Sequence, residues 1–359
     1  MPGPSPRYRW ILPDHGDPTP ELFEAARGRD LSRRLLGVLA TRGHRDAAAL
    51  QALFDEPASV LHDPWLLPDA DRFLARVAQA RSANERVLVF GDFDADGLTG
   101  LAILTRTLRT LGLDTAPYVP DRLGEGHGLS MAAVSRARDD GRTLIITVDC
   151  GTSSAAEIAA AAAVGVDVLV TDHHQPPAVL PAAAAIVNPH LEGSRYPNRD
   201  LAGSGVAFKL AQLLLEREPG GPAMALGMAD LAAVGSLADV VPIIGENRGI
   251  VRLGMLSLTA SPRPAFAALL QAAGVAPERL DMDTIGFAIA PRLNAMSRMG
   301  DAASAARLLL TDDVEEATAL AAELQAANLA RRELTATSLA EARIAAAAQD
   351  GAPAIFVLG

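Results

Sequence analysis

One segment of this chain, residues 86–111, reads RVLVFGDFDADGLTGLAILTRTLRTL, and it indicates the fold class. It opens with a short apolar run, Arg86–Phe90, which predicts a buried strand. An acidic turn that contains glycine follows, and the apolar spacing after it predicts an amphipathic helix over Leu98–Leu111. A strand that runs through a tight turn into a helix is the first half of a βαβ unit, so the segment favours an α/β fold.

The residues after this segment repeat the same alternation of short apolar runs and helical stretches. A helix is expected over Ser153–Val164. Four further strands are expected over Thr115–Val119, Thr143–Val148, Val166–Thr171 and Ala184–Val187. Their apolar residues are continuous rather than alternating, which is typical of strands covered on both faces. The pattern predicts a parallel sheet with helices on both faces.

The regions outside this sheet differ in character. Residues 1–80 are punctuated by proline and read as an N-terminal cap, and 81–312 read as a second domain that contains the sheet. Short helices are expected in the cap over 20–27, 45–54 and 70–84. Residues 201–310 are expected to be mostly helical, with a turn near 240–247 and a loop over 285–300 that is too rich in Gly, Pro and Asn for plain helix.

The C-terminal part predicts a connector between two domains. Residues 313–350 carry helical periodicity and read as one long connector helix. The chain then ends on AIFVLG, which reads as a strand with nothing to follow. We therefore expect 351–359 to begin a further domain.

Composition narrows the class of protein. The chain has 359 residues, of which 49% are hydrophobic, so a sizeable core is expected. Its net charge of −11 is unusual for a nucleic-acid binder, and any such site must be a local basic patch or hold phosphate through metal. The single cysteine, Cys150, excludes an intrachain disulfide and a multi-cysteine zinc cluster, and we expect it to be a small buried residue. Neither a secretory signal nor a membrane-spanning stretch is recognised, so a cytoplasmic protein is expected. A monomer is also expected.

Acidic and histidine residues follow three of the predicted strands. They are Asp92, Asp94 and Asp96 after the first, Asp149 after the third, and Asp172, His173 and His174 after the fourth. Ligands bind beyond the carboxyl ends of the strands in an open parallel sheet, so these side chains should meet in one crevice. A further acid, Asp239, lies in the helical part. Converging carboxylates repel one another unless cations lie between them.

This mixture of ligands suits Mn²⁺, Mg²⁺ or Zn²⁺. Two such ions about 3.5–4 Å apart form a clamp for phosphoryl transfer. Each cluster also has a plainer interpretation. The Asp triplet resembles a calcium loop, although an EF-hand needs a Glu where Ile103 stands. Asp149 alone could be a helix N-cap, Asp239 another helix-end carboxylate, and a His-His pair a surface feature.

Four motifs in this order resemble those of the DHH phosphoesterases: GDFDADG, VDCG, TDHH and LADVVP. Further segments are similar to the RecJ nucleases of that family, namely VPDRLGEGHGLS, NPH, LAGSGVAFKL and APRLNAMSRMGDA. The resemblance covers roughly residues 87–310. RecJ relatives continue into a second lobe with a Gly-rich nucleic-acid-binding motif, so the resemblance implies that a DHHA1-like domain begins at 351–359.

The resemblance implies a role for each residue of the motifs. Asp149 would bridge two divalent ions, Mn²⁺ or Mg²⁺, with Asp94 and Asp92 on one ion. Asp96, His173 and Asp239 would hold the other. His174 would face the substrate phosphate or serve as a further ligand, and the predicted catalytic residues are Asp94, Asp96, Asp149, His173, His174 and Asp239.

The resemblance also implies substrate-binding residues, which are Arg122, His127, His174, Arg292, Asn294 and Arg298. An arginine fork can grip phosphate through two hydrogen bonds. A helix-breaking loop with solvated arginines is the plainer reading of the last three. His127 and Ser297 depart from the family pattern, where Tyr and Gly are expected, which puts fine specificity in doubt. Lys209 is expected on a solvated helix face, and Gly203–Gly205 either presents amides to phosphate or permits close packing.

The expected function is a two-metal exonuclease that hydrolyses single-stranded DNA from an end. The 5′ to 3′ direction and a role in DNA repair and recombination come only from the resemblance, as do a single-strand-binding protein and a helicase as partners. Two alternatives stay open. One is a DHH phosphoesterase for short oligonucleotides or cyclic dinucleotides, and the other is a non-catalytic DHH scaffold, which would have lost ligands.

Overall fold

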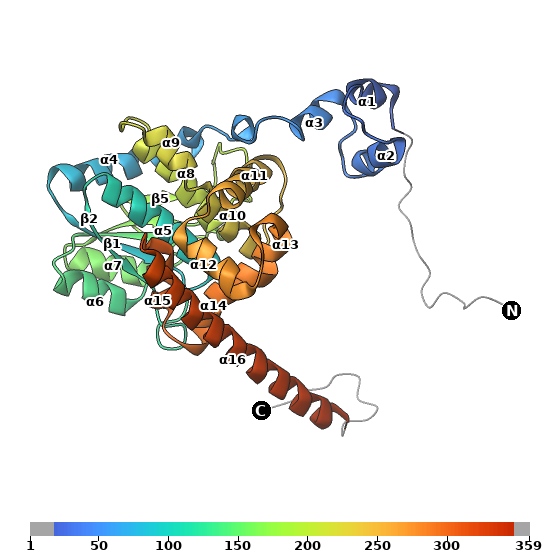
Figure 1. The fold of residues 1–359 in the computed structure, drawn as a ribbon. Coiled ribbons are helices and arrows are strands. Elements are labelled where there is room, and N and C mark those ends of the chain that lie inside the picture. Colours follow the sequence, from blue (N-terminus) through green and yellow to red (C-terminus); the bar gives the residue numbers. More distant parts are fainter. Residues whose placement is uncertain (1–17, 348–359) are drawn as a thin grey trace. The chain divides into compact units, whose positions relative to one another are not determined.

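The computed structural model describes residues 18–347 and divides the chain into two compact units, 18–60 and 61–347 (Figure 1). The unit that contains the sheet therefore begins about twenty residues before the position expected from sequence, at Leu61. The reason is that helix α4, Ala70–Ser82, buries Phe73 and Val77 in the core of the sheet. The expected strand at the C-terminal end lies outside the described residues.

The first unit is a small helical cluster. Its elements are α1 (Pro20–Ala25), α2 (Arg33–Thr41), α3 (Ala47–Ala52) and the 3₁₀ turn η1 (Pro57–Val60). Each α-helix begins with a side-chain cap, from Thr19, Ser32 and Asp46 respectively. Leu22, Leu36 and Leu50 form its core. The sequence analysis missed α2.

The second unit is built on a five-stranded parallel sheet, in the order β2-β1-β3-β4-β5. Its strands are β1 (Arg86–Gly91), β2 (Asp114–Tyr118), β3 (Leu144–Val148), β4 (Asp167–Thr171) and β5 (Ala185–Val187). All five strands lie within two residues of their predicted positions. The predicted fold class is confirmed.

Helices cover both faces of this sheet (Figure 1). On one face, α5 (Ala95–Thr110) and α8 (Gly203–Leu215) pack with α4 on alternate strand residues such as Val89 and Ile146. On the other face, α6 (Met131–Asp139) and α7 (Ala155–Ala163) pack on the residues between them, such as Phe90 and Ile145. The alternation explains why the strands are apolar throughout.

The rest of the second unit is helical. Its elements are η2 (Pro64–Leu66), α9 (Gly221–Leu226), α10 (Ala229–Ala238), α11 (Gly245–Ala260), α12 (Pro264–Ala273), η3 (Pro277–Arg279), α13 (Met282–Thr284), η4 (Ile285–Ile289), α14 (Ala290–Met299), α15 (Ala302–Leu310) and α16 (Val314–Ala347). One stretch, Gly221–Ala238, is long and apolar enough to be a candidate membrane span. It is split between α9 and α10, contains the buried Asp230, and is mostly buried inside the fold, as core helices are.

Two expectations for this helical part are resolved. The predicted loop over 285–300 is wrong, because a π-helical segment, η4, leads directly into α14, with Pro291 in its first turn, where a missing N–H costs nothing. The predicted long helix near the C-terminus is confirmed as α16. Its first half packs on α12, α14 and α15, and from Leu329 to Ala347 no residue is buried (Figure 1).

Candidate metal centre

The carboxyl ends of three neighbouring strands lie level with one another. Gly91 pairs with Val148, and Val148 pairs with Thr171. The next residues along the three strands are Asp92, Asp149 and Asp172. Backbone hydrogen bonds continue past the strand ends, from Asp92 N to Val148 O at 3.2 Å and from Asp149 N to Thr171 O at 2.9 Å. The parallel register therefore brings these three acids to one edge of the sheet, as the sequence predicted.

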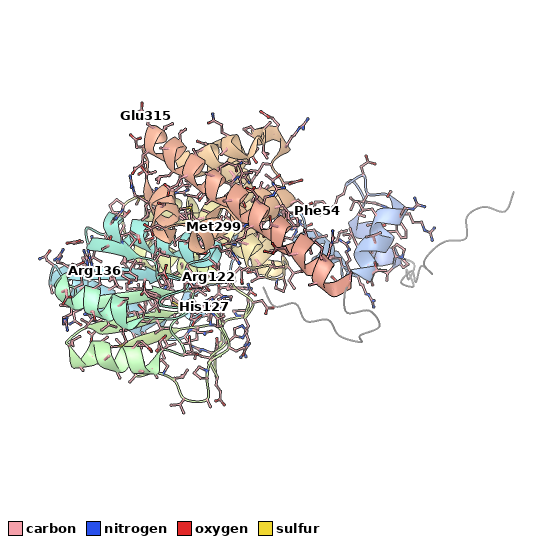
Figure 2. The ribbon with its side chains drawn as sticks, turned by 90° about the horizontal axis from the view of Figure 1, so that it is seen from below. Phe54, Arg122, His127, Arg136, Met299 and Glu315 are labelled. Carbon is pink, nitrogen blue, oxygen red and sulfur yellow. The ribbon has the colours of Figure 1, made fainter. Side chains whose placement is uncertain are left out.

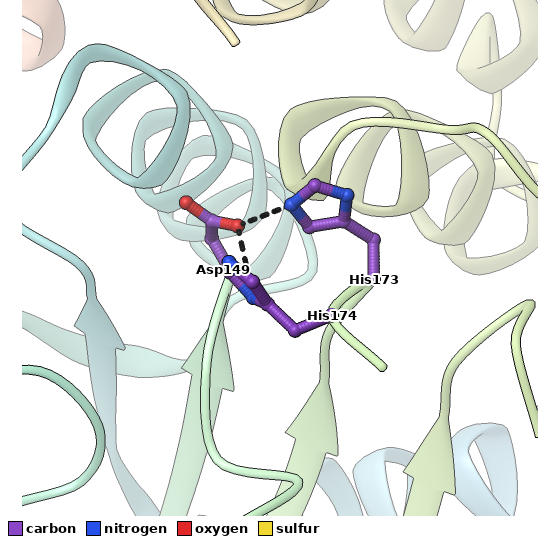
Figure 3. Close-up of side chains that lie close together, drawn as sticks. All are labelled: Asp149, His173 and His174. Carbon is purple, nitrogen blue, oxygen red and sulfur yellow. Dashed lines mark ion pairs between the residues drawn. The ribbon is translucent and has the colours of Figure 1, made fainter. Parts of the chain in front are cut away.

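Asp149 lies at the centre of the acids, with His173 and His174 beside it (Figure 3). Its Oδ1 is 3.0 Å from His173 Nε2 and 3.9 Å from His174 Nδ1. Its backbone is left-handed, at φ +63°, which is uncommon outside glycine. The N-cap position of α7 belongs to Ser154, so the alternative of Asp149 as a helix cap is wrong.

Burial holds the pKa of Asp149 well above its usual range, and the carboxylates of Asp96 and Asp94 raise it further. Asp149 Oδ1 and His173 Nε2 are buried without hydrogen-bond geometry between them, and Asp92 Oδ1 is also buried without a partner. Such atoms are costly unless something binds them. The donor set of carboxylate oxygens and imidazole nitrogens fits divalent cations of the Mn²⁺ or Mg²⁺ kind.

Three groups of side chains lie close enough to share a cation. They are Asp92, Asp94 and Asp149; Asp149, His173 and His174; and Asp96, His173 and Asp239. In each group the candidate ligand atoms lie within 4.8 Å of one another. Asp149 and His173 each belong to two groups. All seven predicted metal or catalytic residues are therefore brought together in the structure.

The first group combines a buried acid with a helix cap. Burial raises the pKa of Asp92, and the neighbouring Asp94 carboxylate raises it further. Asp94 Oδ1 accepts the amides of Asp96 at 2.9 Å and Gly97 at 3.0 Å, so it is also the N-cap of α5. One residue thus serves local structure and contributes to the acidic group, because an N-cap needs only one oxygen of the carboxylate.

The third group joins segments that are far apart in sequence. His173 Nε2 lies 3.9 Å from Asp96 Oδ2 and 3.8 Å from Asp239 Oδ2. Asp239 follows the end of α10, and burial raises its pKa to about 6. Asp96 is buried, and its two oxygens accept the amides of Gly203 at 2.6 Å and Ser204 at 3.0 Å.

The start of α8 therefore binds a carboxylate of the protein rather than a substrate phosphate. A Cβ added at Gly203 would lie 2.5 Å from Asp149 Cβ, and one at Gly235 would lie 2.5 Å from Asp96 Oδ1. These two glycines let α8 and α10 approach the acids closely. Of the two expectations for residues 203–205, close packing is confirmed and phosphate binding by the first two amides is not. Gly235 was missed, because nothing local to its sequence marks it.

Asp172 is a functional candidate to which the sequence analysis assigned no role. Its Oδ1 is 2.8 Å from His174 Nδ1, and its Oδ2 accepts the Thr152 amide at 3.0 Å. Burial alone would raise the pKa of Asp172, but the His174 and Thr152 hydrogen bonds lower it to about 2. The same contact raises the pKa of His174 to about 9. Asp172 therefore orients His174, whose side chain is exposed enough to meet a substrate.

The predicted substrate residues border this centre. His127 Nδ1 lies 3.2 Å from Asp92 Oδ2, and its ring lies 4.4 Å from that of Phe93. The Arg122 guanidinium lies over the same Phe93 ring at 4.7 Å. Figure 2 shows Arg122 and His127 near one another, on the face of the unit that α16 crosses.

The remaining three predicted residues lie on helix α14, not on a loop as expected. Asn294 Oδ1 accepts the Ala95 amide at 2.7 Å, which ties α14 to the start of α5. Arg292 is almost fully buried and donates to the Ala288 carbonyl, while Arg298 lies in the last turn. Whether these residues bind substrate stays a prediction.

Comparison with known proteins now identifies the family. The model of the DHH family, N-terminal domain, matches residues 86–236. A crystal structure of exonuclease RecJ bound to manganese is 41% identical, with a TM-score of 0.70, and the match covers 77% of this chain and 69% of that one. The chain belongs to the DHH family.

Within the DHH family the curated relatives also carry the RecJ name. The single-stranded-DNA-specific exonuclease RecJ of Bacillus subtilis is 37% identical over 305 residues, which is 85% of this chain and 38% of the relative. The RecJ of Salmonella typhimurium is 40% identical over 328 residues, covering 88% and 56% respectively. The chain spans about half the length of the curated relatives it matches, or less. The predicted resemblance is confirmed.

Proposed function

We propose that this chain is the catalytic part of a metal-dependent exonuclease that hydrolyses phosphodiester bonds of single-stranded DNA. The observation that carries the proposal is the set of three overlapping ligand groups that share Asp149 and His173 at the ends of the strands. The names of the RecJ relatives support the substrate class. The alternative of a non-catalytic scaffold is disfavoured, because the candidate ligands expected from the motifs all lie in these three groups.

The fit of the site supports two divalent ions, Mn²⁺ or Mg²⁺. Asp92, Asp94 and Asp149 would hold one, and Asp96, His173 and Asp239 the other, with Asp149 between them. Two ions held in this way would polarise the scissile phosphate and stabilise the negative charge that develops during hydrolysis. The relative of known structure with bound manganese supports this assignment.

The protein's own residues would position the substrate. His174, held through Nδ1 by Asp172, would donate from Nε2 to a phosphate oxygen. Arg122 and His127 approach the centre from the loop after β2, and Arg292, Asn294 and Arg298 from α14. Phe93, between Arg122 and His127, adds an apolar surface beside the acids.

The finer features of the function are also proposals. We propose residues 81–312 as the catalytic domain, with α4 packed on its sheet in the same compact unit. We also propose 5′ to 3′ polarity and a role in repair and recombination. A single-strand-binding protein and a helicase are the proposed partners, and a monomer in the cytoplasm is the proposed state. The similarity to RecJ supports them as a group, and each needs its own experiment.

The decisive experiment is digestion of single-stranded and double-stranded DNA labelled separately at each end. We expect release of label from the 5′ end of the single strand, in Mn²⁺ at least as fast as in Mg²⁺, and poorly in Ca²⁺, whose looser geometry positions a reacting water badly. Faster cleavage of a dinucleotide than of a long strand would favour the small-substrate alternative. No cleavage in any metal, by a chain that still binds Mn²⁺, would favour the scaffold.

A further inference from the structure

The arginines of the second unit differ in whether they have an acidic partner. Many form ion pairs with acids, such as Arg76 with Glu85 at 2.7 Å and Arg263 with Asp230 at 2.6 Å. Five others form no ion pair within the described residues, and these five lie close to one another. This arginine cluster consists of Arg122, Arg292, Arg298, Arg331 and Arg332. It is unexpected in a chain of net charge −11.

Three elements contribute to the arginine cluster. Arg122 comes from the loop after β2, Arg292 and Arg298 from α14, and Arg331 and Arg332 from α16, which packs directly against α14. The last two arginines stand where α16 leaves the core. Asn328, three residues before Arg331, is the last buried residue of the helix and accepts from Arg331 at 3.0 Å.

Two guanidinium groups of the cluster lack part of their hydrogen bonding. The Nε atoms of Arg292 and Arg331 are buried without a partner, and Arg292 is only 8% exposed. A buried donor without an acceptor costs free energy unless a ligand completes it. Within the described residues nothing accepts a hydrogen bond from either Nε atom, so the acceptor would have to come from a ligand.

The charges of the cluster oppose one another. Burial lowers the pKa of Arg292 and Arg332 lowers it further, while burial, Arg122 and Arg331 lower the pKa of Arg298. Five like charges are costly together unless an anion lies among them. The dipole of α14 accounts for Arg298 alone, because only this arginine lies in the helix's last turn.

The cluster is continuous with the metal centre. Arg122 stacks on Phe93, whose neighbour Asp92 belongs to the first group of ligands. The other four arginines lie on α14 and on α16, which packs against α14. A single-stranded nucleic acid carries one phosphate per nucleotide, so a bound strand needs a row of positive groups that extends away from the cleavage site.

We propose that Arg331 and Arg332 on α16 bind backbone phosphates of a single-stranded nucleic acid downstream of the nucleotide in the metal centre. They do so as the far end of a path that begins at Arg122. The inference rests on the proposed function and deepens it, since it assigns a substrate contact to the long helix. The ligand chemistry is a polyanionic backbone, and a lone phosphate ion is the competing source of the same charge.

The test is the salt dependence of oligonucleotide binding in metal-free buffer, where no cleavage occurs. Fluorescence anisotropy of a labelled single strand is measured over a KCl series for the wild type, Arg331→Gln, Arg332→Ala and the double variant. Each lost phosphate contact should lower the slope of log K against log salt by about 0.7. Arg343→Ala is the matched control, because it removes one exposed charge from the same helix beyond the cluster.

A second measurement compares substrates of different length in Mn²⁺. At high salt, the α16 variants should slow hydrolysis of a long strand by a larger factor than hydrolysis of a dinucleotide. Thermal melting of each variant confirms folding, and Arg332, which is exposed, keeps the test valid if Arg331→Gln unfolds.

Equal salt slopes for Arg332→Ala, Arg343→Ala and the wild type would overturn the proposal. So would displacement of the oligonucleotide by inorganic phosphate but not by KCl at matched ionic strength, because that result assigns the cluster to a lone anion. If the proposed function itself is wrong, the wild type will cleave no substrate in Mn²⁺. The binding series in metal-free buffer would still show whether the arginine cluster binds a single strand.

Discussion

Two clusters of buried polar side chains in the second unit differ in how far the protein supplies opposite charges and hydrogen bonds to them. In the first, Lys209 and Glu246 are fully buried with Nζ and Oε1 3.1 Å apart, and Tyr196 donates to the same carboxylate at 2.8 Å. The backbone of His62 completes the cluster, accepting from Lys209 at 2.6 Å and donating to Glu246 at 2.9 Å. In the second, the metal centre, Asp92, Asp96 and Asp149 are buried, and no lysine or arginine of the described residues 18–347 is in ion-pair contact with them.

This difference separates structural burial from functional burial. A buried charge is tolerated when the protein itself supplies the opposite charge and the hydrogen bonds, as around Glu246. Around Asp149 the nearest groups of opposite charge are the two histidines, and nothing in the described residues donates a hydrogen bond to its buried Oδ1. The free-energy cost of burying this carboxylate is therefore offset only when something else binds it. Removing a charge should therefore have opposite consequences for stability at the two clusters.

The largest expected effect is on catalysis, from Asp149→Ala. Cleavage should fall by about 1,000-fold or more, because a carboxylate shared by two ligand groups is lost. In metal-free buffer the variant should melt no earlier than the wild type. The raised pKa of Asp149 means that its ionised form opposes folding above the pH at which an unfolded Asp ionises. Activity assays and thermal melting with and without Mn²⁺ measure both effects.

If Asp149→Ala melts earlier in both buffers and keeps substantial activity, the comparison between the clusters fails at this point. Asp172→Ala is a useful partner variant. Its carboxylate is hydrogen-bonded to His174 and Thr152, so it should lose stability where Asp149→Ala does not.

The next effect is on stability, from Lys209→Met. This substitution leaves the Glu246 carboxylate buried without its cation, which should cost about 3–5 kcal/mol in the free energy of unfolding. The double variant with Glu246→Gln should recover part of the loss. Urea denaturation measures the stability, and Mn²⁺ titration of the folded variant should match the wild type. A loss below about 1 kcal/mol would show that water reaches Lys209.

A smaller effect is expected from Gly203→Ala, at the contact between α8 and the metal centre. The added Cβ meets Asp149 Cβ at 2.5 Å, so the helix or the acid must shift, at a cost of about 1–3 kcal/mol together with weaker Mn²⁺ binding. Gly205→Ala, on the same helix, is the control, because the atom nearest to its new Cβ is in the flexible Leu201 side chain, at 3.2 Å. Scanning calorimetry measures the stability of each variant, and titration calorimetry measures its affinity for Mn²⁺. Identical Mn²⁺ affinity in the two variants would mean that α8 does not position Asp149.

The smallest effect concerns Val240, which follows Asp239 at φ +62° and is 83% exposed. A branched side chain in this conformation is strained, so Val240→Gly should raise metal-free stability by up to about 1 kcal/mol. Val179→Gly is the control, since Val179 is 81% exposed and is not among the residues with positive φ. It should lose stability slightly. If both variants lose stability equally in thermal melting, Val240 stores no strain beside the metal centre.

The sequence by itself determined the sheet and the acids at its edge. Apolar runs such as Arg86–Phe90 predict strands from local composition, and a parallel arrangement brings the residues after them to one side. Asp92, Asp149 and His173 were therefore placed together without any knowledge of long-range contacts, apart from the general rule for parallel sheets.

Only the tertiary structure decided which polar residues are satisfied. Lys209 was expected on a solvated helix face, yet it is fully buried, because its partner Glu246 lies 37 positions later in the chain. The same holds for Gly235, whose missing side chain makes room for Asp96, and for Arg331, which meets the other arginines only because α16 packs on α14. Periodicity reports which face of an element is apolar, but the identity of the group that faces a charge depends on segments distant in sequence.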